Sequence, residues 1–378
     1  MGPDGRARVL WLAKGLGQGG MERLLVTHAR FGDRERFDYR AAYLVDRPHS
    51  VVDELVDLDV PVTRLGTGNG ADLRWVSDLV HLVRSENIDV VHAHSPVPAS
   101  IARPVLRVAT PSTRLIYTEH NRWDRYSTPT RLANMVTYPL DHQAFAVSDD
   151  CRSTIAPRLQ RHVETLIHGI DVDAVAAHKS DRQVARAELG IDDGTVVVGT
   201  VANLRVQKNY PLLLEVAKRV TDEHPNVVFL SVGQGPLEAE LKALHARLGL
   251  GDGFRFLGFR SDVHRVMSAF DIFCLSSDHE GLPVALMEAL ALDLPVVATD
   301  VGGVGDALRG DGASWLVPAG DGEALCRRLS AVARVVSAGA ERLARDSTTF
   351  DARGAVSTLE RTYGSHPGTP LRPGVGCR

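Results

Sequence analysis

The sequence lacks the features that mark membrane-spanning and disulfide-bonded proteins. Its richest apolar region, residues 282–298, is interrupted by Glu288 and Asp293, so it does not read as a bilayer span. The cysteines are few, far apart and without a C-x-x-C pair: Cys151, Cys274, Cys326 and Cys377. This pattern indicates a reducing compartment and argues against a disulfide framework or a zinc cluster.

The sequence also lacks an excess of positive charge. Its 43 Lys and Arg residues and 47 Asp and Glu residues give a formal net charge of −4 at pH 7. Because nucleic-acid-binding domains present a basic surface, nucleic acid is not an expected partner. The apolar run at residues 9–13 is too short for the core of a signal peptide. We therefore expect a globular protein of the cytoplasm.

Short apolar runs alternate with amphipathic segments along the 378 residues, which is typical of parallel α/β folds. The predicted strands are residues 8–13, 39–44, 62–65, 90–94, 115–119, 144–147, 195–201, 227–232, 254–257, 272–275, 295–298 and 314–317. The predicted helices are residues 21–30, 72–84, 131–139, 211–221, 237–248, 284–291 and 323–335. The pattern restarts near residue 195, after a polar segment at residues 177–193, and the length suits two domains.

We predict two doubly wound, Rossmann-like α/β domains that face each other across a deep cleft. Residues 1–172 form the N-terminal domain and residues 173–348 form the C-terminal domain. Residues 349–364 are expected to form a helix that packs back on the N-terminal domain, and residues 365–378 a disordered tail. Ligands of such domains bind at the carboxyl ends of the strands, so the cleft is the expected active site.

A glycine-rich turn follows the first predicted strand. Gly15, Gly17 and Gly20 have the G-x-G-x-x-G spacing of dinucleotide-binding turns, and Asp46 lies where an acidic ribose ligand is expected. Glycines permit close approach of the backbone, and the following helix start offers free amides to a phosphate. On this local evidence an NAD-dependent oxidoreductase remains open.

Two charged groups mark the second half of the chain. Glu280 and Glu288 flank the start of a predicted helix that has Pro283 in its first turn. Because carboxylates repel phosphates, we expect both to accept hydrogen bonds from sugar hydroxyls; exposed acids on an ordinary helix are the alternative. Arg205 and Lys208 follow the strand 195–201 and suit a diphosphate, with a solvated basic loop as the alternative.

Metal sites are suggested by two short patterns. His92 and His94 lie on one side of a strand, but no third ligand is in view beside them. Asp57-Leu58-Asp59 and Asp171-Val172-Asp173 spell D-x-D, the first in an acidic helix-to-loop segment and the second near a domain boundary. We interpret none of these groups as metal-binding.

The charged and glycine-rich segments resemble the retaining glycosyltransferases of family 4, which have the GT-B fold. Glu280 and Glu288 match the family's E-x7-E motif, and Gly19-Gly20-Met21-Glu22 matches its G-G-x-E opening. Arg205 and Lys208 match its R-x-x-K element, which holds the leaving nucleoside diphosphate. Further matches come from Thr118-Glu119-His120, similar to a T-x-H segment, and from Gly233-Gln234-Gly235-Pro236, similar to a G-x-G-P turn.

Three positions depart from the family pattern. Asn209 and His168 stand where glycine and asparagine are usual, and Asp306 replaces a glutamate. Asparagine tolerates left-handed backbone geometry, so the first departure is mild. The resemblance covers about residues 8–362.

The resemblance implies a metal-independent hexosyltransferase without a cofactor, which transfers a sugar from a nucleotide-sugar with retention of anomeric configuration. Uridine is the most frequent base in the family, so a UDP-sugar is expected. The acceptor is a hydroxyl of a glycan, a lipid-linked glycan or a small molecule, in polysaccharide or glycoconjugate synthesis. A nucleotide-sugar 2-epimerase, an oxidoreductase and a silent sugar-nucleotide-binding module are the alternatives.

The resemblance also implies the site. Catalytic roles fall to His120, Glu280, Arg205 and Lys208. Donor binding adds Gly19, Gly20, Asn203, Gly233, Gly281, Leu282, Pro283 and Glu288, and acceptor binding falls to Glu22, Asn121 and Arg122. Arg205 and Lys208 stabilise the departing diphosphate, Glu280 holds sugar hydroxyls, Glu288 holds ribose hydroxyls and His120 positions the sugar.

The acceptor is expected at the N-terminal domain, including the segment 122–138. Its arginines and aromatic residues also suit a peripheral contact with a membrane, and an ordinary helix with exposed arginines is the alternative. These residues are Arg122, Arg125, Arg131, Trp123, Tyr126 and Tyr138.

Overall fold

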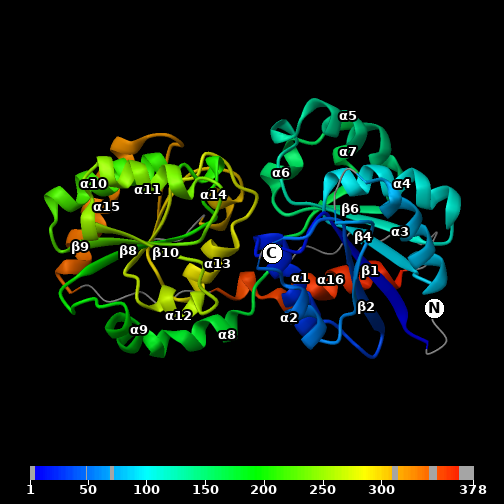
Figure 1. Ribbon diagram of the computed structural model, residues 1–378, viewed down its shortest axis with the longest axis horizontal. Helices are drawn as coiled ribbons and strands as arrows, with labels where there is room; N and C mark the ends of the chain where they lie inside the picture. The colour runs from blue at the N-terminus through cyan, green and yellow to red at the C-terminus, as the bar shows by residue number, and fades with distance from the viewer. Residues whose placement is uncertain (1–4, 48, 69–71, 309–313, 340–346, 366–378) are drawn as a thin grey trace. The chain divides into compact units, whose positions relative to one another are not determined.

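The computed structural model describes residues 5–47, 49–68, 72–308, 314–339 and 347–365. The chain forms two compact units, one of residues 1–169 with 352–378 and one of residues 170–351 (Figure 1). Each unit is built on a parallel sheet with helices on both faces. The predicted pair of doubly wound α/β domains is therefore confirmed.

The sheet of the first unit has seven strands in the order β3-β2-β1-β4-β5-β6-β7, and all its pairings are parallel. The strands are β1 (Ala7–Ala13), β2 (Phe37–Tyr43), β3 (Val62–Arg64), β4 (Val90–Ala93), β5 (Arg114–Glu119), β6 (Gln143–Ala146) and β7 (Val163–Thr165). The central strands are apolar and buried, as expected of a sheet covered on both sides. β7 escaped prediction because it is short and exposes Glu164.

Helices cover both faces of this sheet. One face carries α1 (Gly20–Phe31), α2 (Val52–Asp57) and α16 (Ala352–Gly364). The other face carries α3 (Arg74–Ser85), α4 (Pro96–Ala109), α5 (Thr128–Thr137), α6 (Asp149–Ser153) and α7 (Pro157–Gln160). α4 was not predicted, because its three prolines read as loop residues. Pro96 and Pro98 lie in its first turn, where a missing N–H costs little, and only Pro104 lies deeper.

The sheet of the second unit has six parallel strands in the order β10-β9-β8-β11-β12-β13. They are β8 (Val196–Val201), β9 (Val227–Val232), β10 (Phe254–Gly258), β11 (Ile272–Leu275), β12 (Val296–Thr299) and β13 (Ser314–Val317). One face carries α10 (Tyr210–Glu223), α11 (Glu238–Arg247) and α15 (Gly322–Ser337). The other carries α8 (Val172–Ala177), α9 (Arg182–Glu188), α12 (Val263–Ser268), α13 (Val284–Ala291) and α14 (Gly303–Ala307). Figure 1 shows α10, α11 and α15 on one side of the sheet and α8, α9 and α12 on the other.

The polar segment 177–193 contains α9 and a 3-10 turn, η3 (His178–Asp181), although the sequence suggested no regular structure there. Arg186 explains the difference, because its guanidinium is buried rather than solvated. It donates to the carbonyl oxygens of Asp192 and Thr195, both at 2.7 Å, and pairs with Asp271 at 3.2 Å. Polar residues therefore form part of the interior here.

The chain passes between the two units twice. Ile170 belongs to the second unit, where its N–H donates to the carbonyl oxygen of Phe350 at 2.8 Å and its backbone pairs with Asp351. Beyond Asp351 the chain enters α16, which packs on α1 and β1 of the first unit. Residues 366–378, which include Cys377 and most of the predicted tail, lie outside the described residues.

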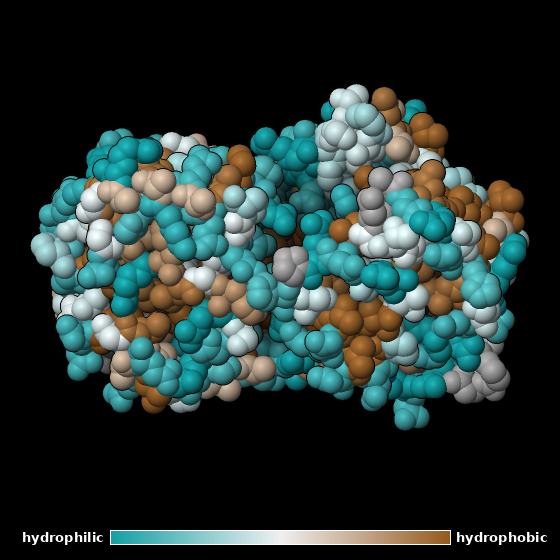
Figure 2. All heavy atoms as spheres, in the orientation of Figure 1, coloured by the Kyte–Doolittle hydropathy of each residue, from teal (hydrophilic) through white to brown (hydrophobic). Residues whose placement is uncertain are grey.

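Polar side chains dominate the face of the molecule seen in Figure 2, and apolar atoms appear there in scattered groups. Among the described residues, the helices are too short or too polar to cross a bilayer. The described cysteines, Cys151, Cys274 and Cys326, are free and buried.

Candidate active site

The predicted residues of the first unit gather at one edge of its sheet. His120 and Asn121 follow β5, and the glycine-rich turn that ends at Gly20 follows β1. His94 follows β4 and His168 lies shortly after β7. Because all these strands are parallel, their carboxyl ends share an edge, where α/β sheets bind ligands.

Histidines form a connected group at this edge. The rings of His92 and His94 lie 4.1 Å apart, so the predicted placement on one side of a strand is correct. Nδ1 of His94 lies 3.1 Å from Nε2 of His120, and the His120 ring lies 5.8 Å from that of His168. Nδ1 of His92 lies 2.7 Å from the hydroxyl of Tyr363 on α16. Among the described residues, no group of three or more His, Cys, Asp or Glu side chains has the arrangement of a metal site.

Burial keeps these histidines neutral. It lowers the pKa of His92, His94 and His120 well below the ordinary value, and that of His168 to about 4. Nδ1 of His168 lies 3.1 Å from the carbonyl oxygen of Leu166, which can only accept, so Nδ1 carries the hydrogen. A neutral imidazole offers one donor and one acceptor, which suits uncharged hydroxyl groups better than phosphates.

Glu119 is a site residue that the sequence analysis did not single out. It ends β5 next to His120 and is fully buried. Its carboxyl accepts hydrogen bonds from Nε1 of Trp123 at 2.7 Å, from the hydroxyl of Tyr126 and from the N–H of Asn121 at 3.3 Å. Burial raises the pKa of Glu119 to about 7, and these hydrogen bonds oppose that rise. Glu119 therefore ties the segment after His120 to the sheet.

The same contacts bear on the aromatic residues of the membrane hypothesis for the segment 122–138. Trp123 and Tyr138 are buried and Tyr126 is half-buried, and Glu119 accepts hydrogen bonds from Nε1 of Trp123 and from the hydroxyl of Tyr126. The aromatic residues therefore do not form an exposed membrane contact. The exposed apolar residues of α5 are instead Leu132 and Val136, at 49% and 72% exposure.

Arg122, which was predicted to bind the acceptor, forms ion pairs with two carboxylates. Arg122 donates to Asp124 at 3.0 Å and also pairs with Asp150 at the start of α6. Asn121 beside it is exposed. The structure thus brings Asn121 and Arg122 to the same edge of the sheet as His120. The guanidinium of Arg122 is already paired with two carboxylates of the protein, those of Asp124 and Asp150.

The glycine-rich turn packs closely against its surroundings. A Cβ on Gly15 would lie 2.9 Å from the carbonyl oxygen of Val45, and one on Gly19 would lie 2.4 Å from Oε2 of Glu22. The Glu22 carboxylate therefore lies against the turn at the start of α1, where the helix dipole favours a negative charge. Asp46, the acidic residue of the dinucleotide interpretation, instead pairs with Arg64 at 3.1 Å.

The predicted residues of the second unit also meet at the carboxyl edge of their sheet. Lys208 follows β8 and Glu280 follows β11. Oε1 of Glu280 accepts from Nζ of Lys208 at 2.5 Å and from Oγ of Ser277 at 2.6 Å. The structure thus brings together a cation and a carboxylate that lie 72 residues apart. Arg205 is exposed in the same loop, and its guanidinium has no bonded partner among the described residues.

Asn209, the residue in place of the family's glycine, adopts the left-handed conformation with φ of 46°. Its side chain does more than tolerate that geometry. Oδ1 accepts from the N–H of Leu212 at 3.3 Å and caps α10, while Nδ2 donates to Oδ1 of Asp278 at 2.8 Å. The side chain therefore links the Lys208 loop to the Glu280 loop, which glycine cannot do.

Glycines let two pairs of loops approach each other here. A Cβ on Gly302 would lie 2.0 Å from the carbonyl oxygen of Glu280, and one on Gly233 would lie 2.1 Å from that of Ala202, next to Asn203. Both glycines have positive φ, so any other residue would be strained as well. The N–H of Gly303 donates to the carbonyl oxygen of Gly281 at 2.6 Å.

α13 begins immediately after Pro283, as predicted, and runs through Ala291. Pro283 itself occupies the N-cap position with an extended backbone, so its predicted place in the first turn is wrong by one residue, and Leu282 and Gly281 precede it. Glu288 lies in the second turn, where it is buried and its Oε1 lies 2.9 Å from Nε2 of His264 on α12. Asp306 on α14 is exposed.

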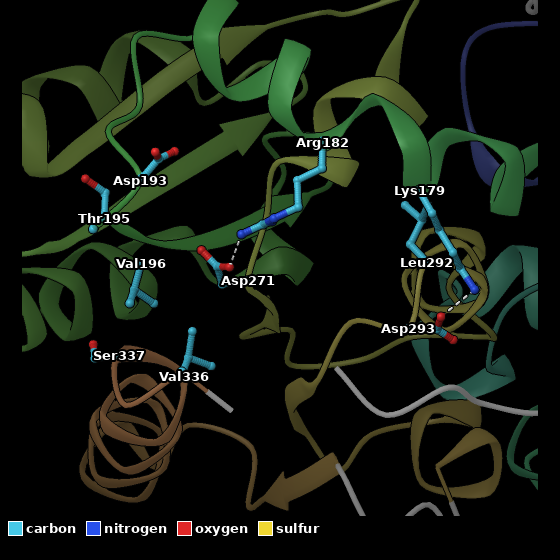
Figure 3. Close-up of a pocket in the computed structure, with 12 residues that line it drawn as sticks. Lys179, Arg182, Asp193, Thr195, Val196, Asp271, Leu292, Asp293, Val336 and Ser337 are labelled. Carbon is cyan, nitrogen blue, oxygen red and sulfur yellow. Dashed lines mark hydrogen bonds and ion pairs between the residues drawn. The ribbon is translucent and has the colours of Figure 1, made fainter. Parts of the chain in front are cut away.

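A pocket of about 620 Å³ lies at the opposite edge of this sheet (Figure 3). Val196 begins β8 and Asp271 directly precedes β11, so the pocket lies at the amino ends of the strands. Figure 3 shows Arg182 pointing toward Asp271, 2.5 Å away, and Lys179 toward Asp293. Of the described residues that line the pocket, none is a predicted site residue, so it is separate from the candidate active site.

Two family models match the chain over most of its length. Residues 8–174 match the model described as Glycosyltransferase Family 4, and residues 181–334 match Glycosyl transferases group 1. The chain belongs to the family 4 glycosyltransferases. The two matches divide near residue 175, and each covers one of the two sheets.

Individual relatives agree with this assignment. The putative glycosyltransferase EpsD of Bacillus subtilis is 28% identical, over 66% of this chain and 69% of its own length. The 2-deoxystreptamine N-acetyl-D-glucosaminyltransferase of Streptomyces fradiae is 29% identical, over 85% of this chain and 80% of its own. Among solved structures, Anabaena HepE in complex with UDP and glucose matches with a TM-score of 0.79 and 20% identity, over 94% of this chain and 99% of its own. This likeness shows the GT-B fold.

Proposed function

We propose that this glycosyltransferase moves a sugar from a UDP-sugar to a hydroxyl acceptor with retention of anomeric configuration. The observation that carries the proposal is the pairing of Lys208 with Glu280 at the carboxyl edge of the second sheet, beside the start of α13. A cation for phosphates and a carboxylate for hydroxyls then lie side by side. The UDP of the HepE complex supports the choice of base.

The diphosphate is bound by Lys208 and Arg205. Arg205 is exposed, and no described residue competes for its guanidinium, so it can form charge-assisted hydrogen bonds to phosphate oxygens. Lys208 has three donors, and Glu280 takes only one of them in the structure. Both cations therefore stabilise the negative charge that grows on the departing UDP, a contribution that is often the largest in catalysis.

The donor sugar is assigned to Glu280 in the second unit, and hydroxyl recognition is assigned to residues of the first unit. His120 is neutral and hydrogen-bonded to His94, which fixes its ring for contact with sugar hydroxyls. Glu22, Asn121 and Arg122 are assigned to the acceptor. No side chain is assigned as a nucleophile, and a donor phosphate oxygen takes the proton of the acceptor hydroxyl. No metal or cofactor has a role in this mechanism.

The acceptor is a glycan, a lipid-linked glycan or a small molecule, in polysaccharide or glycoconjugate synthesis. The name of the Streptomyces fradiae relative supports a small polyol of the 2-deoxystreptamine kind. The neutral histidine group is consistent with an uncharged hydroxyl acceptor in each case.

Two other activities are less well supported. A 2-epimerase of the same fold needs no acceptor, and the acceptor-dependent relative argues against it. An NAD-dependent oxidoreductase needs an acidic residue for the ribose, and Asp46 is engaged with Arg64 at the surface.

A thermal-shift panel of UDP, GDP, ADP, CDP and NAD tests the donor. A ligand at about one hundred times its dissociation constant adds roughly 2.7 kcal/mol to the stability of the folded state, a rise of several degrees in melting temperature. We expect this rise with UDP and none with NAD. A rise with NAD alone would overturn the proposal.

Lys208→Ala should weaken UDP binding about tenfold or more, because one charge-assisted hydrogen bond contributes about 1.5–3 kcal/mol. Isothermal titration calorimetry measures the change. Lys218→Ala is the matched control, since Lys218 pairs with Asp222 on the exposed face of α10 and should leave the affinity unchanged. An unaltered dissociation constant in Lys208→Ala removes Lys208 from the diphosphate site.

A further inference from the structure

Glu288 receives a hydrogen bond from a histidine that lies outside every motif discussed above. His264 lies on α12, 24 residues before Glu288 on α13, and its Nε2 is 2.9 Å from Oε1 of the carboxylate. Both side chains are largely enclosed, with 26% of His264 and 12% of Glu288 exposed. The contact therefore joins two neighbouring helices at the Glu288 carboxylate.

The chemistry of the two side chains determines which one donates the hydrogen bond. A carboxylate oxygen can only accept, so Nε2 of His264 carries the hydrogen. Among the described residues, none donates to the other carboxylate oxygen, Oε2 of Glu288. One oxygen is thus held by the protein while the other keeps its lone pairs for a ligand.

The imidazole of His264 is itself in contact with a second histidine, His178. Its ring lies 5.8 Å from the ring of His178, and Nδ1 of His178 lies 2.7 Å from Oδ2 of Asp181 in η3. The chain of contacts therefore runs from η3 through α12 to α13. Such support limits the rotamers of His264 and, through it, those of Glu288.

We propose that His264 is a positioning residue of the nucleotide site, which holds the Glu288 carboxylate in the orientation that accepts hydrogen bonds from the ribose hydroxyls. This inference rests on the proposed function, because it assigns the ribose of UDP to Glu288. His264 does not touch the ligand; it acts through the carboxylate. A bond that only joined α12 to α13 would stabilise the fold without affecting the recognition of ribose.

Two ligands separate these roles. Calorimetry should compare UDP with 2′,3′-dideoxyuridine diphosphate, which lacks both ribose hydroxyls. For His264→Ala we expect the UDP dissociation constant to rise about tenfold, the size of one lost hydrogen bond. Its affinity for the dideoxy compound should equal that of the wild type. Melting temperature and circular dichroism establish that the variant is folded.

His264→Gln is the matched variant, because its Nε2 places an amide donor near the position of the imidazole Nε2. We expect it to bind UDP within about twofold of the wild type. Glu288→Gln serves as the reference for the ribose contact itself and should weaken UDP binding but not dideoxy-UDP binding. Rescue by glutamine together with the ligand dependence supports the positioning role.

The outcomes separate two failures. If Glu288→Gln weakens UDP binding while His264→Ala leaves it unchanged, the inference is wrong and the donor site stands. The inference is also wrong if His264→Ala weakens both ligands equally, since the role is then structural. If neither Glu288→Gln nor the loss of both ribose hydroxyls changes the dissociation constant, the ribose does not lie at Glu288. The proposed donor site and the inference are then both wrong.

Discussion

Replacing Glu280 with alanine should lower kcat about a hundredfold and leave the dissociation constant of UDP within a few fold of the wild type. Glu280 accepts hydrogen bonds from Lys208 and Ser277, so its carboxylate is fixed, and we assign it to the sugar rather than the diphosphate. Loss of a group that orients a reacting substrate can cost about 10² in rate. UDP binding persists because Lys208 is retained and gains a free donor.

Steady-state release of UDP measures kcat, with the UDP-sugar that the wild type turns over fastest, and calorimetry measures UDP affinity. Glu323→Ala is the control, since this exposed carboxylate pairs with Arg219 at the surface of the same unit and should not affect turnover. Unchanged turnover in Glu280→Ala would remove this residue from the reaction. A parallel loss of UDP affinity would instead place Glu280 at the diphosphate.

Mild acid should destabilise the first unit. Burial lowers the pKa of six of its histidines: that of His28 to about 3, that of His168 to about 4, those of His92, His94 and His120 well below 6.5, and that of His142 below 6.5. The unfolded chain binds these protons near pH 6.5 and the folded chain does not. The stabilisation is therefore complete above about pH 6.5 and is lost progressively as the pH falls toward the folded values.

Two buried carboxyls act in the opposite direction. Burial raises the pKa of Glu119 to about 7 and that of Asp141 to about 6, so both favour the folded state as the pH falls through those values. The six histidines outnumber these two carboxyls. Each proton that only the unfolded state binds costs about 1.4 kcal/mol per pH unit. We expect the melting temperature of the first unit to fall by about 5 °C or more per pH unit below 6.5.

Tryptophan fluorescence follows mainly this unit, because three of the four tryptophans, Trp11, Trp75 and Trp123, are buried in it, and the fourth, Trp315, lies on β13 of the second unit. In His168→Asn the slope of the free energy of unfolding against pH should decrease by about 1.4 kcal/mol per pH unit, because one titrating group has been removed. Leu159→Ala is the control: a cavity in the core should lower stability similarly at every pH. Equal pH slopes in wild type and His168→Asn would contradict the assignment of a neutral His168.

The elements that the sequence predicted best are those with strong local signals. The valine-rich segment at 195–201 is β8, one residue shorter at its start, and the helix after Pro283 has the predicted bounds. Asn209 was expected to tolerate a left-handed backbone and does so. In each case one residue type or one short apolar run determines the local conformation.

The parts that escaped prediction depend on contacts between distant residues. The hydroxyl of Tyr363 contacts His92, 271 positions away in the sequence, and His264 contacts Glu288, 24 positions away. Neither pair has a sequence spacing that predicts a contact. Glu119 had a weak signal, because a carboxylate at the end of an apolar strand needs donors, and Trp123 and Tyr126 follow shortly after it. In the sequence, these aromatic residues suggested a membrane contact. In the structure, both donate hydrogen bonds to the buried Glu119.

Proton NMR of the first product formed from a UDP-sugar tests the central claim most directly. The protein is incubated with an α-linked UDP-sugar, with and without a polyol acceptor, and the anomeric signals are followed from the earliest time points. We expect UDP to be released and the transferred sugar to appear first as the α-anomer, linked to the acceptor or, slowly, as the free sugar. A β-configured first product would contradict retention, and an isomerised UDP-sugar without UDP release would show an epimerase instead of a transferase.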